Sequence, residues 1–249
     1  MGFKKHLKSF VKNWPFILKT ARNLRDGKLF KKSFSKAIKG KNNTLKIDFS
    51  ARLMNCKIEI TGDANQILIK ENTVLNNVNI YIQGSRNRIL LSNNVSFNRG
   101  GALWIEDEYC ELIIGEHTTF EDTHIAVTEP NSKITIGSDC MFANDIDVRT
   151  GDSHSIFDAQ TNKKINYAQN IAIADHVWVG SHVSILKGSK ILSNSIVATR
   201  SVVTKKFDQE GVLLAGTPAK IIKDNITWKR ERTYENETHF EVTAPIERI

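Results

Sequence analysis

The stretch IAIADHVWVGSHVSILKGSKILSNSIVATRSVVTKK, residues 171–206, decides the fold of this chain. Every sixth residue from Ile173 to Val203 is aliphatic and β-branched. A second set, four residues after each of the first five, is aliphatic or small: Val177, Val183, Ser189, Ser195 and Ser201. A period of six matches neither the 3.6 residues of a helix nor the two residues of a strand. A fixed short period of this kind predicts a solenoid of stacked hexapeptides.

The geometry of such a solenoid follows from the two sets of positions. Each hexapeptide forms one short strand of a triangular coil, and the aliphatic residue at its head points into the interior. The second inward position lies near a corner, where only a small side chain fits. Three hexapeptides complete one coil, so we expect Ile173 to stack on Ile191 and Val179 on Val197. An ordinary pair of buried strands would not keep this spacing over six consecutive positions.

A looser form of the repeat extends upstream to Leu45. Aliphatic heads recur there at intervals of 22 or 23 residues, and each is followed six residues later by a large apolar side chain. The heads are Ile47, Ile69, Leu91, Ile114 and Ile136, and their followers are Leu53, Leu75, Phe97, Phe120 and Phe142. We expect corner loops such as Gly62–Asn65 and Gly84–Asn87, where Gly and Asn tolerate positive φ. The coils should fold as one domain, because each buries its interior only against the next.

Two short motifs carry a resemblance to a known family. VWVG at residues 177–180 and GTPAKII at 216–222 resemble the left-handed β-helix acyltransferases. That family includes galactoside, maltose and serine acetyltransferases and the capsule or polysialic acid O-acetyltransferases. The resemblance implies an all-β solenoid, a left-handed parallel β-helix. We expect this domain at residues 45–206, with an inserted loop at about 149–170, a basic helical segment at 1–44 and a C-terminal extension and tail at 207–249.

Positive charge is concentrated at the N-terminus. Residues 1–40 hold 12 Lys or Arg and one acidic residue, Asp26, so that the remainder of this +8 chain carries −3. Apolar residues recur there at helical spacing from Phe3 to Ala21, with Pro15 expected to kink the helix. Such a helix either makes peripheral contact with an anionic membrane or packs on the solenoid or a partner subunit. Because the basic residues lie away from the expected site, we expect no nucleic-acid partner.

Composition limits the location of the protein in the cell. No apolar run approaches the roughly 20 residues that span a bilayer, and no clean apolar core with a cleavage site follows the basic N-terminus. The three cysteines are widely separated, which fits a reducing compartment and no metal cluster. We therefore expect a cytoplasmic protein, with any membrane contact at the inner face of the cell membrane.

The hexapeptide register breaks between Val148 and Ile171, and the polar insert RTGDSHSIFDAQTNKKINYAQN fills the gap. A long segment without regular structure inside a solenoid is usually functional. Residues 140–154, CMFANDIDVRTGDSH, resemble the family's segment that ends in the catalytic histidine, with one residue more here. The resemblance implies that His154 is the general base.

Several residues near His154 in the sequence, or on the preceding coil, are candidates for supporting roles. Asp147 and Asp152 are candidates to orient the imidazole of His154. His124, Asp145 and Arg149 are candidates to bind the acceptor, with His124 the next choice as base. The resemblance also implies that Trp178 lines the acetyl-CoA groove beside the catalytic histidine of a neighbouring subunit in a homotrimer.

The same resemblance implies a set of acetyl-CoA contacts along the late coils. Gly180 and Ser181 would lie near the thioester, and the backbones of Ala198 and Thr199 near the pantetheine. Lysine is suited to phosphate as a point charge. The positions expected near the adenine and the phosphates are Thr204, Lys205, Pro218, Lys220 and Lys223.

These observations predict an O-acetyltransferase that moves acetyl from acetyl-CoA to a sugar hydroxyl of a surface polysaccharide or its precursor. Transfer would be direct, in a ternary complex, and would use no metal. An amino-sugar N-acetyltransferase or a serine-type small-molecule acetyltransferase is the alternative. A β-helix hydratase would need three histidines on one metal, and a non-catalytic scaffold would bind no CoA.

Overall fold

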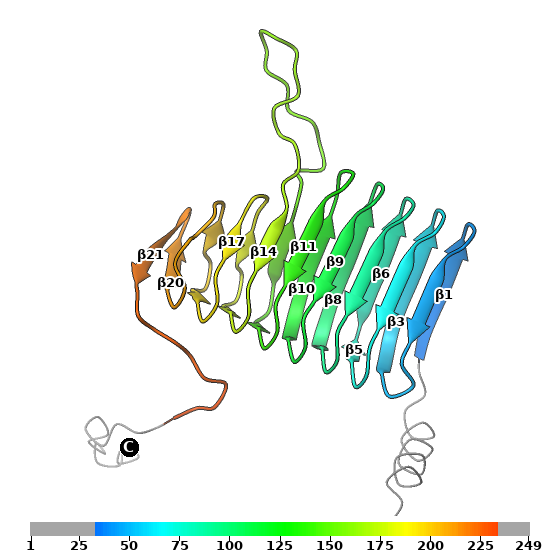
Figure 1. The fold of residues 1–249 in the computed structure, drawn as a ribbon, viewed down its shortest axis with the longest axis horizontal. Coiled ribbons are helices and arrows are strands. Elements are labelled where there is room, and N and C mark those ends of the chain that lie inside the picture. Colours follow the sequence, from blue (N-terminus) through cyan, green and yellow to red (C-terminus); the bar gives the residue numbers. More distant parts are fainter. Residues whose placement is uncertain (1–32, 234–249) are drawn as a thin grey trace, which may run out of the picture.

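A computed structural model describes residues 33–233 of the chain, and these residues fold into a β-solenoid (Figure 1). Every regular element in this range is a strand. All neighbouring strands pair in parallel except the last two. The solenoid is a left-handed parallel β-helix, as the resemblance to the acyltransferase family implies. Between residues 33 and 233 there is no helix of the length and apolarity needed to cross a membrane.

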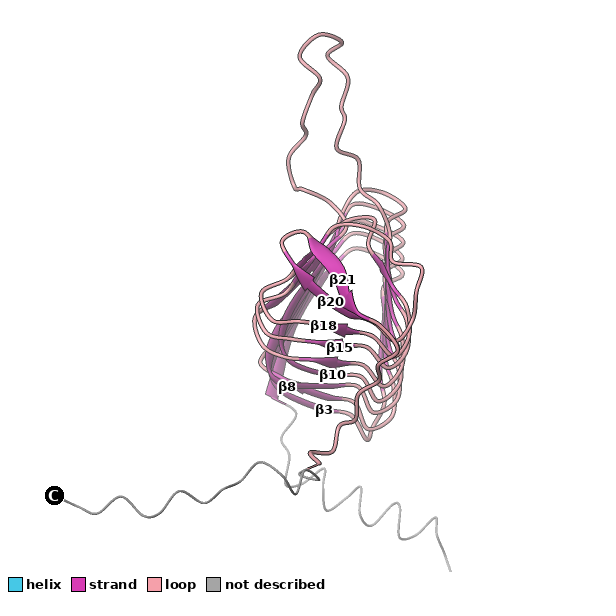
Figure 2. Cartoon of the chain, turned by 90° about the vertical axis from the view of Figure 1, so that its left-hand side faces the viewer, coloured by secondary structure: helices cyan, strands magenta, loops and turns pink. Residues whose placement is uncertain are grey.

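Each coil contributes strands to three faces, which enclose a triangular interior (Figure 2). The first face contains β5 (Val74–Asn76), β12 (Met141–Phe142), β15 (Trp178–Val179), β18 (Ile196–Val197) and β20 (Leu213–Gly216). The second face contains β1 (Ser33–Lys39), β6 (Val78–Gln83), β13 (Ile146–Arg149), β16 (Ser184–Ile185) and β19 (Val202–Val203). Three long strands cross from the first face to the second: β3 (Arg52–Thr61), β8 (Ser96–Glu106) and β10 (Thr119–Val127).

The third face is a separate sheet of seven strands. Its strands are β2 (Thr44–Ile47), β4 (Gln66–Ile69), β7 (Arg88–Leu91), β9 (Glu111–Ile114), β11 (Lys133–Ile136), β14 (Ile171–Ile173) and β17 (Lys190–Ile191). The expected stacking is confirmed here and on the first face. Ile173 is in register with Ile191, and Val179 is in register with Val197.

The interior consists of the residues that the two repeats place there. Phe97, Phe120 and Phe142 are buried in one column, and their ring centroids lie 4.2 and 4.6 Å apart. Leu53 and Leu75 occupy the same column in the coils before them, and Val179 and Val197 continue it in the short coils after them. The additional residues of the early coils lengthen the second face and the corner that follows it, since β6 has six residues and β16 has two.

One corner differs in detail from the sequence expectation. Gly62 and Gly84 do have positive φ, but Asn65 and Asn87 do not. They are buried instead, and the Asn65 side-chain oxygen accepts a hydrogen bond of 3.0 Å from the backbone N–H of Asn87. Stacked asparagines therefore satisfy the backbone of this corner from one coil to the next.

Both ends of the solenoid lie beyond the boundaries expected from the sequence. Residues 33–39, assigned there to the basic helical segment, form β1, because Phe34 and Ile38 pair with Cys56 and Ile60 of the next coil. The rest of that segment, residues 1–32, lies outside the described residues. At the other end, β20 adds a further strand to the first face beyond Lys206. The chain then turns back as β21 (Ala219–Lys223), antiparallel to β20.

Candidate active site

The insert leaves the solenoid after β13, at the corner between the second and third faces, and returns as β14. It projects from the solenoid as one long loop (Figures 1 and 2). An isolated antiparallel bridge between Phe157 and Lys164 joins its two limbs. The loop therefore holds its own shape at the expected position, and His154 lies at its base.

The backbone of His154 is fixed by a small hydrogen-bond network. Its N–H donates to the Asp152 carbonyl at 2.8 Å. The Asn166 amide donates to the His154 carbonyl at 2.8 Å and to the Asp152 carboxylate at 2.9 Å. Lys187 also donates to that carboxylate. The imidazole of His154 is exposed, so the network places its backbone and leaves the ring accessible to a substrate.

Asp152 therefore contacts His154 through the backbone, and its carboxylate does not contact the imidazole that it was predicted to orient. The hydrogen bond from Lys187 lowers the pKa of Asp152, and the hydrogen bond from Asn166 lowers it further. Partial desolvation opposes this effect, but the pKa remains below its usual range. Asn166, which is buried, is the residue that sequence reasoning missed. Its only signal in the sequence is the position of an amide near the end of the insert, where the chain returns to the solenoid.

The second candidate orienting residue, Asp147, has other partners. Its carboxylate lies 2.9 Å from Nδ1 of His124 and accepts two hydrogen bonds from Arg149, at 2.6 and 2.8 Å. Burial opposes ionisation of Asp147, but the hydrogen bonds from His124 and Arg149 outweigh it and hold its pKa below the usual range. Asp147 therefore does not orient His154, contrary to the prediction, but joins His124 to Arg149, two candidate acceptor-binding residues.

The structure thus brings His124 and Arg149 together on the outer side of the second face. Asp145, the third acceptor candidate, lies at the corner between the first and second faces, where its carboxylate is 2.6 Å from Nδ1 of His182. These three residues therefore form two groups rather than one.

Trp178 projects outward from β15 and is 38% exposed. Its ring centroid lies 6.2 Å from that of Trp228, a residue of the C-terminal segment. Trp228 is buried against His176, with ring centroids 4.2 Å apart and nearly parallel planes. The indole N–H donates to the His176 carbonyl, and Nε2 of His176 lies 2.9 Å from the Trp228 carbonyl.

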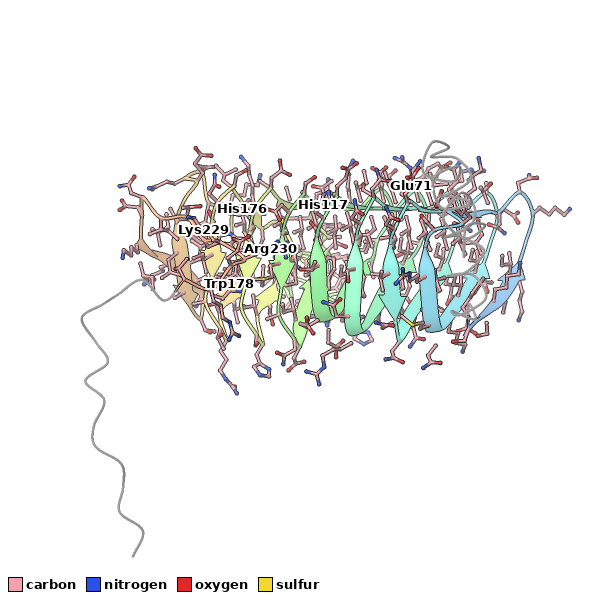
Figure 3. The ribbon with its side chains drawn as sticks, turned by 90° about the horizontal axis from the view of Figure 1, so that it is seen from below. Glu71, His117, His176, Trp178, Lys229 and Arg230 are labelled. Carbon is pink, nitrogen blue, oxygen red and sulfur yellow. The ribbon has the colours of Figure 1, made fainter. Side chains whose placement is uncertain are left out.

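Residues 224–233, here called the strap, run back along the corner between the third and first faces. Figure 3 shows His176, Trp178, Lys229 and Arg230 gathered at this side of the molecule. Arg230 donates to the Asp139 carboxylate at 2.8 Å and to the carbonyls of Cys140 and His117 at 2.8 and 3.1 Å. The repeat pattern predicts no structure for this tail, where Trp228 and Arg230 stand in a polar run.

His154 and Trp178 belong to different parts of the coil. His154 follows the second face, whereas Trp178 lies on the first. A single chain therefore does not present them on the same face.

The residues expected to bind acetyl-CoA follow the late coils. Gly180 lies directly under Thr199, because an added Cβ would come within 2.8 Å of the Thr199 backbone nitrogen. Ser181 donates a 2.9 Å hydrogen bond to the Asn144 side chain, and the Ala198 N–H donates to the Leu214 carbonyl. These four positions lie together at the corner between the first and second faces.

Two of the expected phosphate ligands share a groove of about 610 Å³ at the C-terminal end of the solenoid. Lys205 and Lys220 line it together with Lys206. Thr204 precedes this groove, while Pro218 and Lys223 lie in the β20–β21 hairpin. The remaining lining residues are Phe207, Asp208, Gln209 and Ile221.

Other chemistries have little support in the described residues. Cys56, Cys110 and Cys140 are buried, and burial raises the pKa of the Cys140 thiol to about 12 and that of Cys110 to about 11. Neither thiol is a ready nucleophile. Between residues 33 and 233, no group of three His, Cys, Asp or Glu side chains is placed to hold a metal ion.

Comparison with known proteins gives a consistent group of relatives. The chain is 48% identical to a polysialic acid O-acetyltransferase from Escherichia coli O1:K1 / APEC over 120 residues, 48% of this chain. It is 38% identical to a polysialic acid O-acetyltransferase from Neisseria meningitidis over 122 residues, 49% of this chain. The two alignments span 38% and 56% of these relatives' own lengths, less than two thirds in both cases. No protein-family model matches the chain.

Two solved structures match much more of the fold. The polysialic acid O-acetyltransferase OatWY has a TM-score of 0.76 and 30% identity, covering 82% of this chain and 94% of its own. The polySia-specific acetyltransferase NeuO has a TM-score of 0.71 and 33% identity, covering 83% of this chain and 93% of its own.

Proposed function

Because the chain belongs to the family of hexapeptide-repeat acetyltransferases that contains the polysialic acid O-acetyltransferases, we propose that it acetylates a surface polysaccharide. The donor is acetyl-CoA, and the acceptor is a sugar hydroxyl of an acidic polymer such as polysialic acid. The observation that carries this proposal is the exposed imidazole of His154, whose backbone is held by Asp152 and Asn166.

The proposed reaction is a direct transfer. The imidazole of His154 takes the proton of the sugar hydroxyl while its oxygen attacks the thioester carbonyl of acetyl-CoA. The tetrahedral intermediate collapses with loss of the CoA thiolate, which receives that proton from the imidazolium. A general base of this kind contributes about 10²–10⁴-fold to the rate. The high pKa of the buried Cys110 and Cys140 thiols supports a path without a cysteine acyl-enzyme.

The donor would follow the corner and the groove described above. The thioester end would lie beside Gly180, which packs closely against Thr199 of the next coil. The cations of Lys205, Lys206 and Lys220 would hold the phosphates at the end of the groove.

We propose that the complete site needs a second copy of the chain, in a homotrimer. His154 and Trp178 lie on different faces of one chain. The projecting insert also carries four large hydrophobic residues that are 53–61% exposed: Ile156, Phe157, Ile165 and Tyr167. A protruding loop with such an apolar surface is typical of a protein–protein contact, and a neighbouring subunit would bring Trp178 to His154.

A peripheral membrane contact of the basic N-terminus is a separate proposal, supported by the 12 Lys or Arg within residues 1–40. Sedimentation with anionic liposomes tests it. The full chain should sediment with the vesicles and a chain lacking residues 1–32 should not; equal sedimentation would overturn the proposal.

The test of the proposed function is thiol release from acetyl-CoA by wild type and His154→Ala, with polysialic acid, neutral glycans and free amino sugars as acceptors. Activity with polysialic acid that falls by about 10²–10⁴-fold in the variant supports the proposal. His117→Asn is the matched control, because it changes a histidine on another corner to a residue that tolerates its positive φ. Full activity of His154→Ala would overturn the role of the base, and acetylation of amino sugars alone would favour the N-acetyltransferase.

A further inference from the structure

A pair of stacked aromatic side chains lies on the outer side of the second face, away from the core. Tyr81 of β6 and Trp104 of β8 are in register, with ring centroids 4.1 Å apart and planes inclined by 27°. Trp104 is nevertheless 37% exposed. The pair is not needed to fill the interior, which the inward residues Ile80, Ile82, Leu103 and Ile105 already occupy.

The stack ends at Trp104 because the next coil carries a small residue at the same position. Ala126 is in register with Trp104, and Arg149 is in register with Ala126. Tyr81 covers one face of the Trp104 indole, so the opposite face is directed toward the coil of Ala126. Adjacent strands lie about 4.8 Å apart, so Trp104 and Arg149 are separated by about 10 Å along the solenoid.

This arrangement combines an aromatic ring face with an oriented guanidinium group. The two hydrogen bonds from Arg149 to Asp147 fix the direction of that group. An aromatic face binds the apolar C–H face of a sugar ring, and a guanidinium group binds a carboxylate or hydroxyl at its edge. The row leads to the insert, since residues 150–154 follow Arg149 directly.

We propose that Tyr81 and Trp104 form a subsite for the acceptor polysaccharide, about two coils away from the sugar that is acetylated. The inference rests on the proposed function and adds a binding position to it. The polymer lies along the second face, with one ring on Trp104 and the reacting ring at the insert. Short acceptors reach only the reacting position, whereas longer chains also reach Trp104. The oriented guanidinium group of Arg149, between the aromatic pair and His154, favours an acidic glycan over a second copy of the chain.

The test uses polysialic acid oligosaccharides of graded length with wild type, Trp104→Ala and Trp104→Tyr. We expect Trp104→Ala to raise KM about tenfold for long oligosaccharides. The KM for the shortest active acceptor and kcat should be unchanged. Trp104→Tyr should restore most of the affinity, because it restores a ring face. Tyr109→Ala is the matched control, since Tyr109 is an exposed aromatic residue at a corner, 51% exposed.

Three outcomes would overturn the subsite. The first is an unchanged KM for long oligosaccharides in Trp104→Ala, and the second is an equal rise for all lengths. The third is a change of oligomeric state of Trp104→Ala in light scattering, which would make this face a contact between copies. Calorimetric binding of the polysaccharide without acetyl-CoA separates this proposal from the proposed function. If activity depends on His154 but polysaccharide binding does not depend on Trp104, only the subsite proposal is overturned. The absence of any polysaccharide binding by wild type removes both.

Discussion

At the residue scale, the base of the insert depends on one buried amide. Asn166 donates to both the Asp152 carboxylate and the His154 carbonyl, and its oxygen accepts a 2.7 Å hydrogen bond from the Ile156 N–H. Three separate points of the loop are therefore held by one side chain. The position of His154 follows from this amide rather than from a carboxylate in contact with the imidazole.

Asn166→Ala should lower kcat by about tenfold, with little change in KM for acetyl-CoA. The expected cause is displacement of the His154 backbone, because loss of positioning of a catalytic group by about 1 Å can cost up to 10²-fold. Steady-state kinetics with varied acetyl-CoA and a fixed long acceptor would measure this. Gln160→Ala, at the exposed end of the same loop, is the control and should behave as wild type. An unchanged kcat for Asn166→Ala would show that the amide is not required for placement of the base.

At the scale of the element, the strap contacts coils that are distant from it in the sequence. Arg230 binds the carbonyl of Cys140, 90 residues earlier, and that of His117, 113 residues earlier. Trp228 packs on His176 and lies beside Trp178. The strap thereby connects the C-terminal segment to the wall of the solenoid that carries the proposed acyl-site tryptophan.

Arg230→Ala should release the strap without unfolding the solenoid. The substitution removes the hydrogen bonds to Asp139 and to two backbone carbonyls, and Trp228 then loses its fixed position. We expect faster amide hydrogen exchange in residues 224–233 and a red shift of tryptophan emission, with far-UV circular dichroism unchanged. Arg232→Ala, two residues further along, is the control. Wild-type exchange rates in Arg230→Ala would contradict the assigned contacts.

Docking of the strap should also depend on acid pH through Asp139. Partial burial opposes ionisation of this carboxylate, but hydrogen bonds from Arg230 and His176 outweigh it, so its pKa lies below the usual value. A carboxyl whose folded pKa is lowered stabilises the folded state above its unfolded pKa of about 3.9. This contribution is lost as the pH falls through the lower folded value. We expect tryptophan emission to shift below about pH 4.

Asp139→Asn tests the assignment of this transition. The variant lacks the titrating carboxyl, so its strap should be weakly held at pH 7 and the shift below about pH 4 should be missing. A wild-type transition in Asp139→Asn would assign the effect to another carboxylate.

At the scale of the whole molecule, assembly should depend on the insert. Phe157 and Ile165 are 54% and 60% exposed on a loop that projects away from its own solenoid. The double change Phe157→Ser, Ile165→Ser should convert the proposed trimer to monomer and lower activity, with the thermal midpoint of the solenoid nearly unchanged. Light scattering and thiol release measure the two effects. Phe49→Ser, a change of a 57% exposed residue elsewhere, is the control. A double variant that remains a trimer would show that the insert is not the contact.

The sequence by itself determined the solenoid, the register of its coils and the site of the insert. Each hexapeptide specifies its own inward head and small corner residue, so the pattern is local and repeats without knowledge of distant residues. Ile173 on Ile191 and Phe120 between Phe97 and Phe142 followed directly from that spacing.

Only the tertiary structure decided the ends of the solenoid, the strap and the partners of the acidic residues. β1 and β20 are strands because each pairs with the backbone of a neighbouring coil, and no local sequence pattern indicates this pairing. Asp147 and Asp152 each have several cationic or polar neighbours in the sequence. Which groups they bind depends on the coils that lie beside them. Asp147 binds His124 and Arg149, and Asp152 binds Lys187 and Asn166. Contacts between residues about 90 or more positions apart, as for Arg230, arise from the stacking of coils, and a local repeat carries no information about them.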